Sequence, residues 1–153
     1  MKKRIMVDMS ATLIHHGHIR LLKKASEYGS VVVGLTSDEE IINKKKYKPE
    51  LGFEYRKEIL ESIKYVSEVV PTPWLLDEKV LDKYQIDLLV HGDDNSNLIE
   101  TRRLKLLPRT EGVSSSEIRK NAQRAITEIN NQKLMLTPGP AVVLQDNIEH
   151  LKP

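Results

Sequence analysis

Three of the five histidines in the chain lie in one stretch, His15-His16-Gly17-His18. A zinc pair on a helix needs i, i+4 spacing and a third ligand, whereas His15 and His18 are i, i+3 and the chain has no cysteine. Polar capping of a helix and acid–base chemistry are further readings. We favour phosphate binding, because Gly17 lets the backbone approach a ligand and the amides at a helix N-terminus attract an anion.

A second pattern suited to anions is Arg-Thr-Glu-Gly-Val-Ser-Ser-Ser at residues 109–116. Gly112 lets the backbone turn, the serines offer hydroxyl donors, and Arg109 offers a planar fork for phosphate oxygens. The same serines followed by Glu117 also fit an ordinary capping box. Two such helix starts in one small domain indicate a ligand with several phosphate groups.

Three further segments with polar or aromatic side chains are expected near these two motifs. The run Lys44-Lys45-Lys46 is expected in a loop, either solvated or folded over bound phosphates. Residues 90–94, Val-His-Gly-Asp-Asp, place a glycine before two acids, which suits a ribose, a base amine or a hydrated magnesium ion. Trp74 follows a proline and is either a core residue or a platform for a cation.

The elements that must position these residues follow from hydrophobic periodicity. We expect strands at residues 5–7, 31–35, 68–70, 86–90 and 104–107, and helices at residues 19–28, 53–66, 77–84 and 117–129. Strands that alternate with helices at this spacing predict an α/β fold with a doubly wound parallel sheet. Ligands bind in that fold where the carboxyl ends of strands meet helix N-termini.

The composition favours one soluble domain. The chain has 153 residues and a net charge of +2, without the basic stripe of a nucleic-acid binder. It has no apolar run of about 18 residues to span a membrane and no signal-peptide core. We expect a cytoplasmic protein without nucleic-acid or membrane partners. The domain is expected at residues 1–130, and a linker with the truncated start of another domain at residues 131–153.

The two phosphate patterns together carry a resemblance. Residues 15–18 are similar to the HxGH signature of the nucleotidyltransferase superfamily, and residues 109–116 resemble the RTEGISTT-type signature of its cytidylyltransferase branch. The similarity runs from about residue 4 to residue 122. It implies a Rossmann-like nucleotidyltransferase fold and direct in-line transfer of CMP from CTP to a phosphoryl acceptor, with release of pyrophosphate.

The resemblance also implies roles for particular residues. The catalytic set would be His15, His18, Lys45 and Arg109. The nucleotide-binding set would be Gly17, Arg56, Gly92, Asp93, Thr110, Gly112, Ser114 and Ser115. Magnesium would arrive with CTP, held mainly by phosphate oxygens and without metal ligands from the chain. Members of the family are commonly homodimers, so a homodimer is implied.

The acceptor site departs from the family pattern at one position. The family has an acid that reads the cationic head of the acceptor, and Thr12 stands in its place. Asp8 matches an earlier family aspartate, and Trp74 resembles the tryptophan of the phosphocholine and phosphoethanolamine enzymes. The resemblance therefore assigns Asp8, Thr12 and Trp74 to the acceptor site. Because Thr12 replaces the family acid, we expect an acceptor that differs from phosphocholine and phosphoethanolamine.

The end of the chain suggests which acceptor that is. Lys133-Leu-Met-Leu-Thr-Pro-Gly-Pro-Ala141 resembles the start of fold-type-I aminotransferases such as 2-aminoethylphosphonate:pyruvate transaminase, which depend on pyridoxal phosphate. Fusion to such an enzyme would make 2-aminoethylphosphonate the expected acceptor. Phosphoethanolamine, phosphocholine and glycerol 3-phosphate are the alternatives, and a CTP-sensing module without turnover is an alternative from another class.

Overall fold

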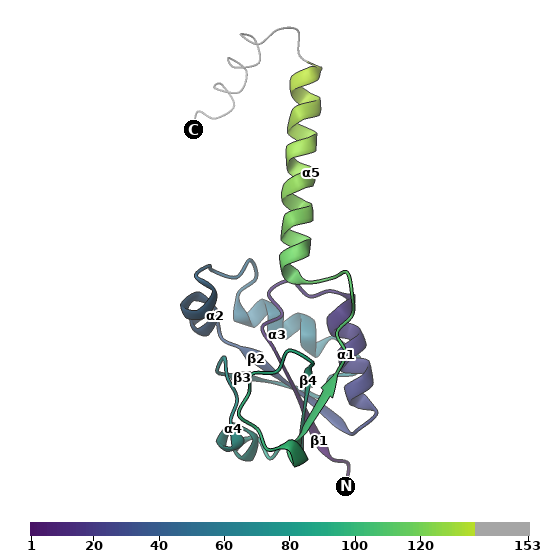
Figure 1. Ribbon diagram of the computed structural model, residues 1–153, viewed down its shortest axis with the longest axis vertical. Coiled ribbons are helices and arrows are strands. Elements are labelled where there is room, and N and C mark those ends of the chain that lie inside the picture. The colour runs from purple at the N-terminus through teal and green to yellow at the C-terminus, as the bar shows by residue number, and fades with distance from the viewer. Residues whose placement is uncertain (137–153) are drawn as a thin grey trace. The chain divides into compact units, whose positions relative to one another are not determined.

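The structure, a computed structural model, describes residues 1–136 of the chain (Figure 1). It contains one parallel sheet whose five strands lie in the order β3-β2-β1-β4-β5. The strands are β1 (Arg4–Met9), β2 (Ser30–Thr36), β3 (Glu68–Thr72), β4 (Leu88–Gly92) and β5 (Leu104–Leu107). The doubly wound parallel sheet expected from the sequence is therefore confirmed. The strand order reverses between β1 and β4, which is where such sheets bind ligands.

Helices lie between consecutive strands along the chain, and a longer helix follows the last strand. They are α1 (His16–Ser26), α2 (Asp38–Lys45), α3 (Phe53–Glu61), α4 (Glu78–Lys83), the 3-10 turn η1 (Thr101–Arg103) and α5 (Ser115–Met135). The chain divides into two compact units, and the first, Met1–Ser115, contains the whole sheet. The second begins at Ser116 and includes nearly all of α5. Within residues 1–136, no helix is both long enough and apolar enough to cross a membrane.

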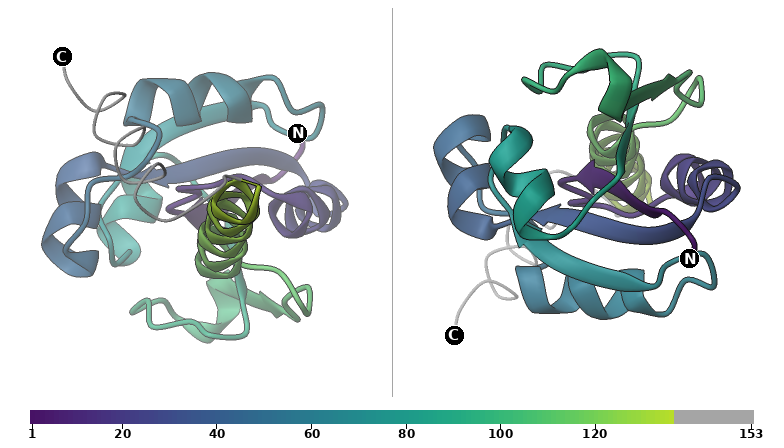
Figure 2. Two further views of the ribbon diagram at one scale, coloured as in Figure 1. Left: turned by 90° about the horizontal axis from the view of Figure 1, so that it is seen from above. Right: turned by 90° about the horizontal axis from the view of Figure 1, so that it is seen from below.

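The sheet separates two hydrophobic cores, with helices on both of its faces (Figure 2). Alternate residues of a strand point to opposite faces. In β1, Ile5 therefore packs in one core with Leu22 of α1 and Leu60 of α3. Its neighbour Met6 packs in the other core with Leu81 of α4. Burial on both faces explains why the strands read as continuous apolar runs rather than alternating ones.

Several helices differ from the expectation, among them α3, which ends at Glu61 and not at residue 66. The segment before Lys46, expected as a loop, is helix α2, because the Ser37 hydroxyl caps its start by accepting from the Glu40 amide at 3.3 Å. Acids in its first turn and lysines in its last turn suit the helix dipole. Helix α5 continues to Met135 instead of ending near residue 129. Most of the resemblance to transaminases, from residue 137 onward, lies outside the described residues.

Arg56 of α3 is fully buried and connects the ends of two strands to the neighbouring loops. Its guanidinium donates to the carbonyl oxygens of Ser10 at 2.6 Å, Thr36 at 3.0 Å and Leu51 at 3.0 Å. It also forms an ion pair with Asp38 at 2.5 Å. Ser10 follows β1, Thr36 ends β2 and Asp38 begins α2, so one side chain fixes these three segments relative to one another.

Replacing Arg56 with leucine is expected to lower the free energy of unfolding by about 3–5 kcal/mol, because it leaves buried carbonyl oxygens and Asp38 without their partner. Urea denaturation followed by circular dichroism measures the change. Lys57→Met is the matched control, since Lys57 lies next to Arg56 and forms only an exposed i, i+4 pair with Glu61. Its loss should cost less than about 0.5 kcal/mol. Equal effects for the two variants would contradict the role given to Arg56.

Candidate active site

A cavity of about 980 Å³ opens at the carboxyl ends of the strands. Its walls come from the ends of β1, β2 and β4, from helix α1 and from the segment after β5. It is large enough for a nucleotide and a small second substrate. Nine of the residues expected at the site line it, namely Asp8, His15, Gly17, His18, Lys45, Trp74, Gly92, Arg109 and Thr110.

His15 and His18 cap the start of α1 through their own rings. Nδ1 of His15 accepts from the Gly17 amide at 3.1 Å, and Nδ1 of His18 accepts from the His15 amide at 3.2 Å. A ring nitrogen that accepts carries no proton, so each neutral ring holds its hydrogen on Nε2. His15 is thus the N-cap and His18 the N3 residue, so the helix begins at His16, before the start expected at residue 19. Capping and phosphate binding are not alternatives here, since capping leaves Nε2–H free to donate.

Both rings are held in the neutral form at neutral pH. Burial lowers the pKa of His18 to about 3, with further contributions from His15 and Arg109. Burial, His16 and Arg109 also lower the pKa of His15. The ring centroids of His15 and His18 lie 3.9 Å apart, so protonation of one opposes protonation of the other. The pair can therefore donate hydrogen bonds to an anion without exchanging protons.

Gly17 is required by the packing between these histidines and the segment after β5. A Cβ atom at residue 17 would lie 2.9 Å from Nδ1 of His15 and 3.2 Å from Cγ1 of Val113. Any side chain there would displace the His15 ring from its capping position. The glycine of the HxGH motif therefore brings the histidine pair and residues 109–113 to the same cavity.

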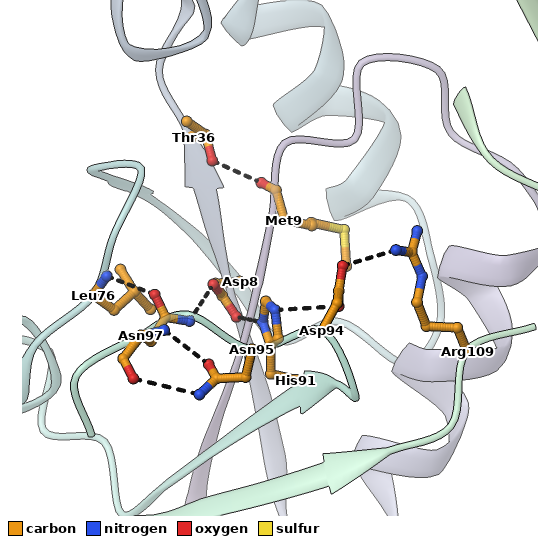
Figure 3. Close-up of polar contacts among 9 residues, drawn as sticks. All are labelled: Asp8, Met9, Thr36, Leu76, His91, Asp94, Asn95, Asn97 and Arg109. Carbon is orange, nitrogen blue, oxygen red and sulfur yellow. Dashed lines mark hydrogen bonds and ion pairs between the residues drawn. The ribbon is translucent and has the colours of Figure 1, made fainter. Parts of the chain in front are cut away.

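Arg109 lines the same cavity as the two histidines, and its Nη1 donates to Asp94 at 2.8 Å (Figure 3). Asp94 also lines the cavity, whereas its neighbour Asp93 is exposed and does not. The aspartate that lines the cavity is thus one position after Asp93, the residue expected at the nucleotide pocket. Gly112 has a φ of +76°, which few other residues adopt, and lets the backbone turn between Arg109 and α5.

Lys45 and Trp74 meet at the edge of the cavity. The ammonium group of Lys45 lies 5.5 Å from the centroid of the Trp74 ring, within the range of a cation–π contact. The backbone amide of Trp74 donates to Glu40 of α2 at 3.2 Å, which ties the tryptophan loop to the helix that carries Lys45. Both residues expected from the sequence are brought together, with the lysine already over the aromatic ring.

Asp8 is bonded through both of its carboxylate oxygens. Oδ1 lies 2.5 Å from Nδ1 of His91, and Oδ2 accepts from the Asn97 amide group at 3.0 Å (Figure 3). Burial lowers the pKa of His91, but the hydrogen bond to Asp8 and the charges of Asp8 and Asp94 outweigh it and raise the pKa above its ordinary value. Asp8 lies at the cavity but is paired with His91 instead of being available to an acceptor.

Gly112 and four other expected site residues also lie outside the cavity wall. Arg56 is fully buried and supports the strand ends. Thr12 is also buried, and its hydroxyl accepts from the Tyr47 hydroxyl at 3.4 Å. Ser115 donates to the Leu13 carbonyl at 3.1 Å, so it fixes the loop before His15. Ser114 does not line the cavity either. Arg56 and Ser115 therefore support the backbone segments that carry the site.

Several cavity residues were not expected. Arg20, Lys23 and Lys24 line it from α1, and their spacing along the helix was a signal visible in the sequence. His91 was part of a segment of interest but had no role assigned. Asn97 gave no signal, because its contact with Asp8 joins residues far apart in the chain.

The chain offers no metal site of its own in the part that the structure describes. No group of three or more His, Asp or Glu side chains is arranged to hold an ion among these residues. The two aspartates at the cavity are already engaged, Asp8 with His91 and Asn97, and Asp94 with Arg109. The side chains described therefore do not fit a bound magnesium ion without a ligand that brings its own oxygens.

A parallel sheet with a capped helix N-terminus at its switch point, and with an arginine that lines the same nucleotide-sized cavity, is typical of a Rossmann-like nucleotidyltransferase fold. The comparison with known proteins agrees with this class. Residues 10–121 match the family model described as cytidylyltransferase-like. The chain belongs to this family.

Its relatives include enzymes for different acceptors. Glycerol-3-phosphate cytidylyltransferase of Bacillus subtilis is 35% identical over 122 residues, which span 76% of this chain and 95% of the relative. Ethanolamine-phosphate cytidylyltransferase of Arabidopsis thaliana is 36% identical over 131 residues, 75% of this chain and 31% of the relative. The crystal structure of the lipopolysaccharide core biosynthesis protein from Thermoplasma volcanium GSS1 has a TM-score of 0.61 at 16% identity, covering 72% of this chain and 100% of that one, and supports the fold alone.

His18, the more buried histidine of the pair, makes the stability of the fold depend on pH. In the unfolded chain residue 18 takes up a proton near pH 6.5, whereas in the folded protein it does so only near pH 3. Stability is therefore lost as the pH falls below 6.5. Lowering the pH from about 7 to about 5 should cost about 2 kcal/mol through His18 alone.

Urea denaturation of the protein and of His18→Gln over this pH range measures the effect, since glutamine can still accept from the His15 amide but does not titrate. The variant should lose less stability on acidification than the unsubstituted protein. His16→Gln, at an exposed histidine in the same helix, is the control and should keep the full pH dependence. Parallel curves for the protein and His18→Gln would refute the assignment.

Proposed function

We propose that the chain transfers CMP from CTP to 2-aminoethylphosphonate and releases pyrophosphate. The observation that carries the nucleotidyl-transfer part is the pair of neutral histidines whose Nε2–H groups are left unused by helix capping, in the same cavity as Arg109. Donors fixed in place before the reaction stabilise charge that develops in the transition state.

In the proposed reaction, a phosphonate oxygen of the acceptor attacks the α-phosphorus of CTP in line with the bond to the β-phosphate. The new P–O bond forms as the old one breaks, and its electron pair leaves with pyrophosphate. His15 and His18 donate to the α- and β-phosphate oxygens, and Arg109 with Thr110 holds the outer phosphates. Lys45 reaches the α-phosphate and the acceptor, and Gly92 borders the nucleoside.

The choice of 2-aminoethylphosphonate is supported by the sequence at the end of the chain, which resembles transaminases for this compound. It is also supported by Thr12, which replaces the acid that related enzymes use for a cationic head group and which is buried against Tyr47. An ammonium group on the acceptor would meet the Trp74 ring, where a cation already lies. A pocket altered in this way favours an acceptor other than phosphocholine.

Glycerol 3-phosphate is the second candidate acceptor. It is supported by the Bacillus subtilis relative, whose length the match covers almost completely. Phosphoethanolamine is supported by the relatives named for that acceptor. A CTP sensor without turnover is less favoured, because sensing does not require the histidine pair and the arginine around one phosphate chain.

Other features of the proposal are not tied to single contacts. Magnesium is proposed to arrive with CTP, bound through phosphate oxygens, because the chain has no metal site of its own among the described residues. A homodimer and fusion to a transaminase that uses pyridoxal phosphate are also proposed from the resemblance, and a cytoplasmic location is proposed from the composition.

Release of pyrophosphate should require CTP, magnesium and the correct acceptor together. A panel of 2-aminoethylphosphonate, phosphoethanolamine, phosphocholine and glycerol 3-phosphate ranks the acceptors by kcat/KM. We expect the phosphonate to rank first. A higher kcat/KM for glycerol 3-phosphate would overturn the choice of acceptor but keep cytidylyl transfer, and tight CTP binding without turnover on any acceptor would favour the sensor.

His18→Ala should lower kcat about 100- to 1,000-fold, because its Nε2–H stabilises charge that develops as pyrophosphate leaves. Its effect on the dissociation constant of CTP should be much smaller, since the ground-state phosphates keep Arg109 and the helix amides. Steady-state kinetics and calorimetric titration of CTP separate the two quantities. Equal losses in both would mean that His18 binds only the ground state.

A further inference from the structure

A line of polar contacts runs through the cavity from Asn97 to Arg109 (Figure 3). Asn97 donates to Asp8 at 3.0 Å, and Asp8 lies 2.5 Å from Nδ1 of His91. Nε2 of His91 lies 3.7 Å from Oδ1 of Asp94, and Oδ2 of Asp94 accepts from Arg109 at 2.8 Å. The line therefore joins the end of β1 to the arginine after β5.

The inner part of this line is fixed and the outer part is exposed. The side chains of Asp8 and His91 are 10% and 20% exposed. Asn97 is buried as well, and its side-chain oxygen accepts from the Leu76 amide at 2.8 Å. The side chains of Asp94 and Arg109 are 55% and 56% exposed. Asp8 and Asn97 thus hold the His91 ring with Nε2 toward Asp94, while Asp94 and Arg109 are able to move.

Asp94 lies between Arg109 and the His91 ring but bonds to only one of them. Its contact with Arg109 has the length of a hydrogen-bonded ion pair. Its contact with His91, at 3.7 Å, is too long for a hydrogen bond. Phosphate oxygens compete with a carboxylate for the same guanidinium, so a triphosphate at Arg109 would take the present partner of Asp94 away.

We propose that Asp94 exchanges partners when the triphosphate binds: Arg109 turns from Asp94 to the phosphates, and Nε2–H of protonated His91 takes its place at Asp94. His91 is then a positioning residue for CTP binding, because it keeps Asp94 neutralised and away from the phosphates. This inference rests on the proposed function, which makes Arg109 a triphosphate ligand.

The exchange requires the charged form of His91. The charged groups that act on its ring are Asp8 from β1, Asp94 from the loop after β4 and Arg109 from the segment after β5. The two carboxylates outweigh both burial and the arginine and raise the pKa of His91, so the ring keeps its proton to a higher pH than an ordinary histidine. CTP affinity should fall as the pH rises through this pKa, because Asp94 then loses its second cation.

A double-mutant cycle with His91→Gln and Asp94→Asn tests the exchange by calorimetric titration of CTP. His91→Gln alone should weaken CTP binding about threefold to tenfold, the scale of an exposed ion pair. CMP is the matched ligand, since it lacks the outer phosphates expected at Arg109, and its affinity should not change. In the Asp94→Asn background, where no carboxylate remains to be neutralised, His91→Gln should have no further effect on CTP binding.

The pH profile gives a readout that a purely structural role would not move. As the pH rises and His91 loses its proton, CTP binding by the unsubstituted protein should weaken relative to CTP binding by His91→Gln. Ionisation of the terminal phosphate of CTP affects both proteins alike, so it cancels in this comparison. Additive effects in the cycle, equal losses for CTP and CMP, or parallel pH profiles would overturn the exchange while leaving the proposed function intact. Failure of the unsubstituted protein to bind CTP would overturn both.

Discussion

The geometry of the site depends on one buried guanidinium. Arg56 donates to the carbonyls at the ends of β1 and β2 and forms an ion pair with the first turn of α2. The histidine loop continues from the first of these segments, and Lys45 lies at the end of α2. A charge in the interior is stable only when its donors are satisfied, and here the groups that satisfy it are the segments that carry the chemistry. The fold thus positions catalytic residues through a side chain that does not line the cavity.

The fold followed from the sequence because its signals are local. β-branched runs buried on both faces and helices of regular period are enough to predict a doubly wound sheet and the edge at which it binds ligands. Helix α2 was missed because its apolar residues are few and only Ile41 is buried. Its capping serine and its acidic first turn were present in the sequence, and they were the signal that could have predicted it.

The site was predictable in its motifs but not in its contacts. Spacing and residue type placed His15, His18 and Arg109 at one ligand, and they line one cavity. Spacing could not show that Asp8 is paired with His91 and Asn97, since these contacts join residues more than 80 positions apart. It also could not separate Asp93 from its neighbour Asp94, because both lie in the loop after β4, where no periodicity indicates which side chain lines the cavity. Long-range pairing decides which carboxylates remain available to a ligand.

These internal pairs also determine how the cavity can recognise charge. Three groups that a substrate would meet in the cavity already have a partner: Asp8 has His91, Asp94 has Arg109, and the Trp74 ring has Lys45. A substrate therefore gains only the difference between its own contact and the one it replaces. Such a site discriminates between substrates by what happens to the displaced residue, because a side chain released from its pair must find another partner nearby. His91 is placed to provide that second partner on the phosphate side, and on the acceptor side Lys45 would move from Trp74 toward the phosphates that it is proposed to bind.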